Sequence, residues 1–104
     1  MNIQKMMKQA QKMQEELQRT QEELSQRTVE ASVGGGKVTV VATAGGDVLS
    51  LKIDPQVVDP EDVEFLQDLI LSGIQQALAK GRELQQAEMS KVTGGLGLPP
   101  GLGF

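Results

Sequence analysis

The chain has 104 residues, of which 38% are hydrophobic and 23% charged, with 10 Lys and Arg against 14 Asp and Glu. The absence of Cys and His excludes disulfide bonds, thiol or imidazole catalysis and the common zinc sites. The absence of Trp and Tyr removes the usual stacking platforms for single-stranded nucleic acid. This composition predicts a single soluble domain that is not an enzyme and binds no cofactor, metal or small-molecule substrate.

Residues 2–26 predict a long first helix, because the stretch lacks Gly and Pro and is rich in strong helix formers. At 1.5 Å per residue, such a helix is roughly 37 Å long, more than so small a core requires. Its apolar residues recur every three or four positions and form one stripe. The stripe comprises Ile3, Met6, Ala10, Met13, Leu17, Thr20 and Leu24. Two arrangements remain open: a helix packed along its own sheet, or a rod that partly protrudes and pairs with another chain.

Residues 28–53 change to a period of two, with many β-branched side chains and two short glycine turns. This pattern is typical of strands joined by tight hairpins. We expect three strands in an antiparallel meander, beginning near Thr28, Lys37 and Val48. One face of this sheet is apolar, and the other carries polar side chains.

A second helix is expected after the Asp54-Pro55 break. Asp59 is the predicted N-cap, Pro60 the first helical residue, and the helix is expected to end near Lys91. The fold class is therefore α+β, a three-stranded antiparallel meander flanked by two long helices. Residues 1–92 form the domain, and residues 93–104 form a flexible tail rich in Gly and Pro.

Gly73 and Gly81 lie inside the second predicted helix, where each costs about 1 kcal/mol relative to Ala. They are eight residues apart and hence close to one face of the helix. We interpret them as packing positions that allow a strand or another helix to approach closely.

Two motifs that suggest ligand chemistry do not meet its requirements. The glycines at 34–36 precede Lys37 as in a phosphate-binding loop, but Ala31 and Val38 occupy positions that such a loop gives to Gly and to Ser or Thr. A hairpin turn is the better interpretation. Six acidic residues without a basic neighbour could form a metal site, but they lack EF-hand spacing, and we interpret them as a solvated helix start. They are Asp54, Asp59, Glu61, Asp62, Glu64 and Asp68.

Basic residues are concentrated at the start of the chain. Residues 1–14 contain Lys5, Lys8 and Lys12 and no acidic residue. Their spacing of three and four places them on one face of the first helix. Such a tip can contact DNA phosphates even on an acidic protein, although a solvated lysine face is the alternative. Arg19, on the same helix, completes the candidate DNA-binding set.

The order and spacing of several segments resemble the YbaB/EbfC family of bacterial nucleoid-associated proteins over nearly the whole chain. The segments are Met6–Gln14, Gly34–Val38, Ile53–Pro55, Leu66–Ile70, Met89–Gly95 and Leu98–Gly101. The resemblance implies an α-β-β-β-α fold and a tweezers-shaped homodimer that binds double-stranded DNA and bends or compacts it. It further implies roles in nucleoid organisation, gene regulation and DNA protection, and it transfers no catalytic residues.

A second hypothesis is a protein-interaction adaptor linked to DNA replication or recombination repair. Met6, Met7 and Met13 supply flexible side chains suited to adaptable surfaces. Strong dependence of DNA binding on salt favours the first hypothesis, and DNA-independent capture of a partner favours the second. No helix places Arg and Asn for reading base edges, so we expect largely sequence-independent binding.

Localisation follows from the absence of apolar segments. No stretch approaches the roughly 18–20 apolar residues of a membrane span. The first residues also lack the apolar run of a signal peptide. We expect a protein of the cytoplasm and nucleoid without a membrane partner.

Overall fold

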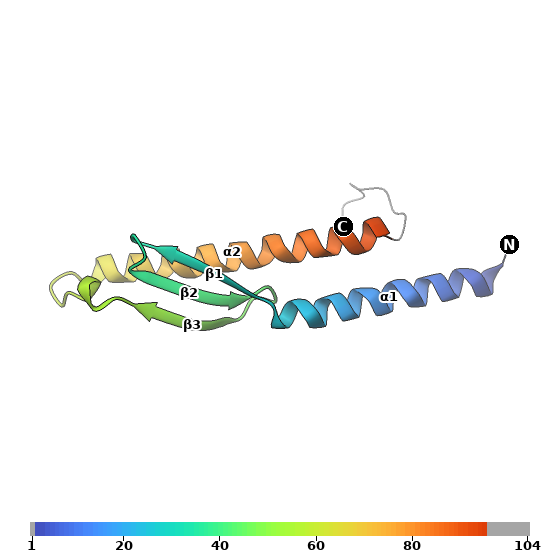
Figure 1. Ribbon diagram of the computed structural model, residues 1–104, viewed down its shortest axis with the longest axis horizontal. Coiled ribbons are helices and arrows are strands. Elements are labelled where there is room, and N and C mark those ends of the chain that lie inside the picture. Colours follow the sequence, from blue (N-terminus) through green and yellow to red (C-terminus); the bar gives the residue numbers. More distant parts are fainter. Residues whose placement is uncertain (1, 96–104) are drawn as a thin grey trace.

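The computed structural model describes residues 2–95 and has the predicted α-β-β-β-α order (Figure 1). Its elements are α1 (Ile3–Gln26), β1 (Thr28–Val33), β2 (Val38–Thr43), β3 (Val48–Ile53), a short 3-10 helix η1 (Pro55–Val57) and α2 (Val63–Gly95). The molecule is elongated, measuring 72 × 23 × 16 Å. The sheet occupies one end, and α1 and the second half of α2 extend away from it together (Figure 1).

The first helix protrudes from the sheet. It begins after Asn2, whose side-chain Oδ1 accepts a hydrogen bond from the backbone N–H of Lys5 at 3.2 Å. Only its last turns are covered: Leu24 is 2% exposed, whereas Ile3 is 65% and Met6 56% exposed. Part of α1 therefore protrudes, as in the second of the two arrangements left open by the sequence, and the pairing with another chain stays a prediction.

The sheet is a meander in the order β1-β2-β3, with both pairs antiparallel. The first hairpin pairs Val33 with Val38 across the glycine turn at 34–36, where all three φ angles are positive (63°, 67° and 87°). Glycine adopts this backbone conformation without steric cost. Since the turn joins two strands and opens no helix, the hairpin interpretation is confirmed.

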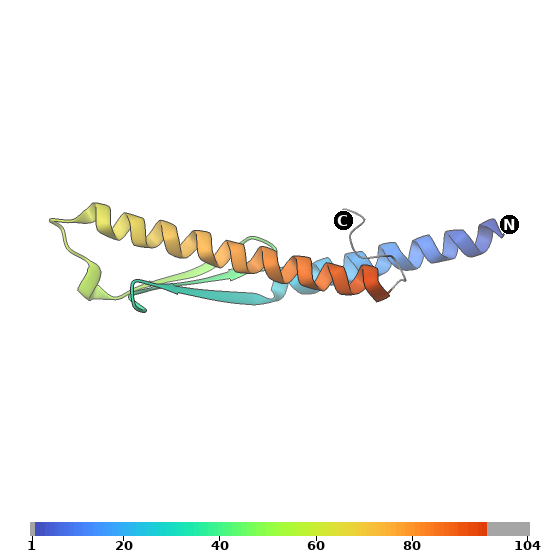
Figure 2. The same cartoon turned by 90° about the horizontal axis from the view of Figure 1, so that it is seen from above.

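The hydrophobic core lies between α2 and one face of the sheet (Figure 2). Its buried members are Ala31, Val38, Val40, Ala42 and Ala77. Helix α2 packs on β1 and β2. The apolar side chains of β3 remain largely outside this contact. Val48, Leu49 and Leu51 are between 41% and 57% exposed.

The two glycines of α2 let the helix lie directly on β2. A Cβ atom at Gly73 would come within 2.9 Å of Val40 Cγ2, and one at Gly81 within 2.9 Å of the backbone oxygen of Thr43. Both distances are shorter than a normal van der Waals contact. The prediction that these residues serve close packing is confirmed.

The start of α2 differs from the prediction. Asp59 closes a turn: its side chain accepts from the N–H of Glu61, and its backbone oxygen accepts from the N–H of Asp62, both at 2.9 Å. The helix begins at Val63 instead, where Asp62 Oδ1 accepts from the N–H of Phe65 at 3.3 Å. Asp followed by Pro favours a local turn over a helix start, so the next Asp becomes the cap.

The far end of α2 also differs. The helix continues past Lys91 to Gly95. Glycine lowers helix propensity but keeps the backbone N–H that a further turn requires. The predicted tail from Leu96 onward lies outside the described residues. Neither helix, over the part of the chain described, has an apolar stretch able to cross a membrane.

Candidate nucleic-acid interface

Three lysines form a basic tip on the protruding half of α1. Lys5, Lys8 and Lys12 are exposed, and within residues 2–95 none of their side chains forms an ion pair or hydrogen bond. Successive lysines are separated by rises of about 4.5 and 6 Å along the helix. Their charges are therefore available to an external anion.

Arg19 lies elsewhere, in a cleft of about 650 Å³ between α1 and α2. The cleft is lined by Lys12, Glu15, Glu16, Arg19, Glu88, Lys91 and Val92. Three cations and three carboxylates make this lining electrically neutral. Arg19 itself is 3.0 Å from Glu16. The structure thus places Arg19 in the same cleft as Lys12 but away from Lys5 and Lys8, and the carboxylates of the cleft do not favour a polyanion.

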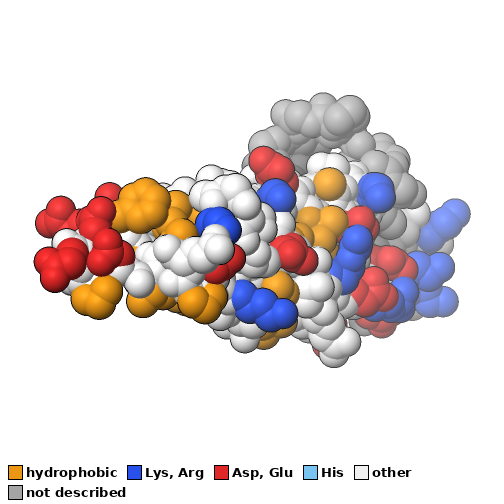
Figure 3. All heavy atoms as spheres, turned by 60° about the vertical axis from the view of Figure 1, so that its left-hand side comes forward, with side chains coloured by type: hydrophobic (Ala, Val, Ile, Leu, Met, Phe, Trp, Pro, Cys, Tyr) orange, Lys and Arg blue, Asp and Glu red, His pale blue; other side chains and the backbone are white. Residues whose placement is uncertain are grey.

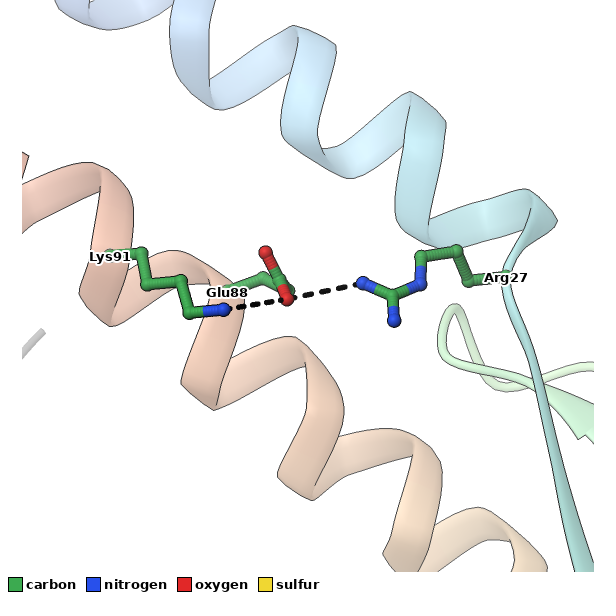
Figure 4. A network of polar contacts seen from close by, with 3 residues as sticks. All are labelled: Arg27, Glu88 and Lys91. Atoms are coloured by element: carbon green, nitrogen blue, oxygen red, sulfur yellow. Dashed lines mark hydrogen bonds and ion pairs between the residues drawn. The ribbon is translucent and has the colours of Figure 1, made fainter.

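An ion-pair network joins the base of α1 to α2 (Figure 4). Arg27 donates a hydrogen bond to Glu88 Oε1 at 3.1 Å, and Lys91 Nζ lies 3.4 Å from the same oxygen. The Arg27 hydrogen bond, supported by Lys91, lowers the pKa of Glu88 below its ordinary value of 4.5. Arg27 and Glu88 are 61 positions apart, so no local spacing in the sequence reveals the pair.

This network predicts a pH-dependent effect of Glu88→Gln. The pKa of Glu88 is lowered in the folded protein, so its ionised side chain stabilises the fold. This stabilisation is present above the ordinary Glu pKa and disappears as the pH falls through the lowered pKa. Thermal unfolding should show a lower Tm for the variant than for the wild type near pH 7, and the difference should shrink as the pH falls below the ordinary Glu pKa. Glu83→Gln, on the same helix and without an ion pair to any described residue, is the control. A Tm difference of equal size above and below that pKa contradicts the prediction.

Lys37, which follows the glycine turn, has a structural role. Its Nζ lies 3.4 Å from Asp54 Oδ2 and also donates to Gln56 Oε1. A hydrogen bond from the backbone N–H of Gln56 is the main cause that lowers the pKa of Asp54, and the hydrogen bond and charge of Lys37 lower this pKa further. These contacts fasten η1 to the end of the first hairpin.

Acidic side chains gather at the end of the molecule where α2 begins (Figure 3), and this end lies opposite the α1 tip (Figure 1). They include Asp59, Glu61, Asp62 and Glu64, all exposed. Among the described residues, no three acidic side chains are grouped so that they could hold a metal ion. The end of the molecule opposite the α1 tip is therefore acidic.

The profile of the YbaB/EbfC DNA-binding family matches residues 1–96. The chain belongs to this family. As a member of the YbaB/EbfC DNA-binding family, it is not an enzyme, as its composition predicted.

Relatives within the family are close. The chain is 55% identical over 104 residues to a protein of Akkermansia muciniphila, with 100% of each chain covered. It is 59% identical over 101 residues to one from Acetivibrio thermocellus, covering 97% of this chain and 89% of the relative. Both are named nucleoid-associated proteins.

A solved structure has the same fold. The crystal structure of the uncharacterized protein HP0035 from Helicobacter pylori superposes with a TM-score of 0.72 at 22% identity, covering 84% of this chain and 91% of that one. This similarity supports the α-β-β-β-α architecture of the YbaB/EbfC chain.

Proposed function

We propose that this chain is a nucleoid-associated protein that binds double-stranded DNA as a homodimer through the tips of its two α1 helices. The observation that carries the proposal is the exposed cluster of Lys5, Lys8 and Lys12, which is unpaired within residues 2–95, on a helix that protrudes from the domain. The names of the two bacterial relatives support it. Two tips that hold separated phosphates can bend or compact the duplex, with consequences for gene regulation, nucleoid organisation and DNA protection.

The net charge of −4 does not oppose this mode of binding. The acidic side chains around Glu61 lie at the opposite end of a molecule 72 Å long. Electrostatic interactions in solution are screened over about 8 Å at physiological salt. The tip therefore approaches the duplex as a local cation, almost independently of the acidic end.

The direct experiment is the salt dependence of binding to a labelled duplex of about 40 base pairs, followed by fluorescence anisotropy. Six lysines of a dimer in contact with six phosphates give a slope of log K against log salt near −5. Raising salt from about 50 to about 200 mM should lower the affinity roughly 10³-fold. Absence of binding at the lower salt concentration, or a slope near zero, contradicts the proposal.

Strand β3 is the proposed dimer contact. Leu49 and Leu51 are 57% and 41% exposed, and β3 is an edge strand beside the core. Exposed apolar side chains on an edge strand are typical of a surface that another chain covers. A second copy that covers β3 buries the apolar side chains of this strand that α2 leaves exposed.

The double variant Leu49→Asp, Leu51→Asp is expected to be monomeric by light scattering, because two carboxylates cannot be buried in an apolar interface without partners. Both side chains are exposed within one protomer, so the fold should be retained. Ser50→Asp, on the opposite face of β3, is the matched control and should remain dimeric. A wild type that is monomeric, or a double variant that is dimeric, contradicts the β3 interface.

The adaptor hypothesis retains one structural argument. Met6 and Met7 are 56% and 60% exposed beside the tip lysines. Flexible methionines of this kind suit variable protein partners, which here would be replication or recombination proteins. Capture of such a partner by the chain in nuclease-treated extract, with no binding to bare duplex, would favour this function over DNA binding.

A further inference from the structure

The apolar stripe of α1 is covered along only part of its length. Helix α1 packs against α2, and the stripe is buried at Leu24 and half-buried at Leu17. At Ile3 and Met6 the same stripe is exposed. The covering helix ends at Gly95, and the N-terminal part of α1 extends beyond it (Figures 1 and 2). The stripe therefore continues past the end of α2 with no cover from the described part of the chain.

The uncovered part of the stripe and the tip lysines lie on opposite sides of α1. Each lysine is two positions from a stripe residue, which is a rotation of about 200° around an α-helix. The pairs are Ile3 with Lys5, Met6 with Lys8, and Ala10 with Lys12. An occupant of the stripe therefore leaves the lysines open to an external anion.

The segment that follows α2 in the sequence has the composition of a cover. Residues 96–104 contain four large apolar side chains and no charged residue. The four are Leu96, Leu98, Leu102 and Phe104. Segments that stay disordered are typically poor in such side chains. Two consecutive prolines, Pro99 and Pro100, oppose a continued helix and favour an extended backbone. The segment therefore suits burial along an apolar surface.

The segment begins close to the uncovered stripe. Lys91 and Val92, near the end of α2, line one cleft with Lys12 of α1. Nine extended residues span up to about 30 Å. Along the axis of α1, Met13 and Ile3 are only about 15 Å apart. The segment is thus long enough to follow the stripe to its end, and its attachment to α2 keeps it at a high effective concentration there.

We propose that residues 96–104 pack on the uncovered apolar stripe of α1 in the same chain and continue the cover that α2 provides. The contact buries Ile3, Met6 and Ala10 and fixes the protruding half of α1 to the rest of the domain. It differs from the flexible tail that the Gly and Pro content predicts. It does not rest on the proposed function, because the three lysines stay on the other side of the helix.

Hydrogen exchange gives the first test. The variant Leu98→Ser, Leu102→Ser removes two of the covering side chains. Backbone amides of residues 5–13 should then exchange at least about threefold faster than in the wild type, because a helix that loses its packing opens more often. Amides of β2 should be unaffected. The matched control Gly97→Ser, Gly101→Ser adds the same hydroxyls, keeps every apolar side chain and should exchange as the wild type does.

A pair of introduced cysteines gives the second test, since the chain contains no cysteine of its own. Met6→Cys, Leu98→Cys places one thiol on the stripe and one in the segment. The control Gln4→Cys, Leu98→Cys moves the first thiol about 200° around the helix. Equilibration with reduced and oxidised glutathione measures the effective concentration of each pair. We expect a value at least about tenfold higher for the Met6 pair, with the disulfide inside one chain, because a packed segment reaches only one side of α1.

Three results would overturn the proposal: equal exchange of the α1 amides in the double Leu variant and the wild type, equal effective concentrations for the two cysteine pairs, or a disulfide that joins two chains. The last result, seen as a doubled mass on a non-reducing gel, would assign the stripe to the segment of a second copy. Far-UV circular dichroism establishes that each variant is folded. Every variant keeps the three tip lysines, so the outcomes are independent of DNA binding.

Discussion

Replacing Lys5, Lys8 and Lys12 together by Gln is expected to lower the affinity for a duplex of about 40 base pairs at least about a hundredfold at about 50 mM salt. Each lysine that contacts a phosphate releases a condensed counterion, and a dimer loses six such contacts. Gln keeps the length and helix propensity of the side chain but not its charge. The same variant should keep the dimer mass in light scattering, because the N-terminal end of α1, which carries the three residues, lies far from β3 (Figure 1).

The matched control makes the same charge change on the body of the molecule. This control replaces three exposed residues together by Gln: Lys52, Lys80 and Arg82. This variant should bind DNA within a few-fold of the wild type. If the tip variant retains full affinity, the interface lies among the remaining cations instead. These are Arg19, Arg27, Lys37, Lys52, Lys80, Arg82 and Lys91, and loss of binding by the control would favour the three that it replaces.

The second large effect is expected from Gly81→Val, which should lower the free energy of unfolding by about 2 kcal/mol. A Cβ atom there would meet Thr43 O at 2.9 Å and Ala44 Cα at 3.3 Å. Both are backbone atoms and cannot rotate away, so α2 must shift from the sheet. The higher helix propensity of Val offsets only about half a kcal/mol of this cost. The Tm should fall by roughly 10 °C.

Gln86→Val is the control for Gly81→Val, because Gln86 is exposed on the same helix. It introduces the same β-branched side chain without a close neighbour and should leave Tm nearly unchanged. A Gly81→Val protein that is as stable as the wild type would show that α2 can move away from β2 at little cost.

The candidate site was only partly readable from the sequence. The lysine cluster could be predicted, because a spacing of three and four fixes the face of any helix that contains it. Arg19 was grouped with these lysines by its helix alone, and the structure places it beside Glu16 in a neutral cleft. The pairing of Arg27 with Glu88 joins segments 61 positions apart and has no local pattern.

Local interactions determined much of the fold. Positive-φ glycines, alternating β-branched residues and a glycine-free helix are effects of neighbouring residues, so the hairpin, the strands and the length of α1 follow from the sequence by itself. The start of α2 shows the limit, because Asp59 and Asp62 both suit a cap and only their competing hydrogen bonds select Asp62. Tertiary structure alone decided that α1 protrudes, that β3 stays uncovered and that the basic and acidic surfaces lie at opposite ends. These features depend on which faces pack together, and packing joins residues that are distant in the sequence.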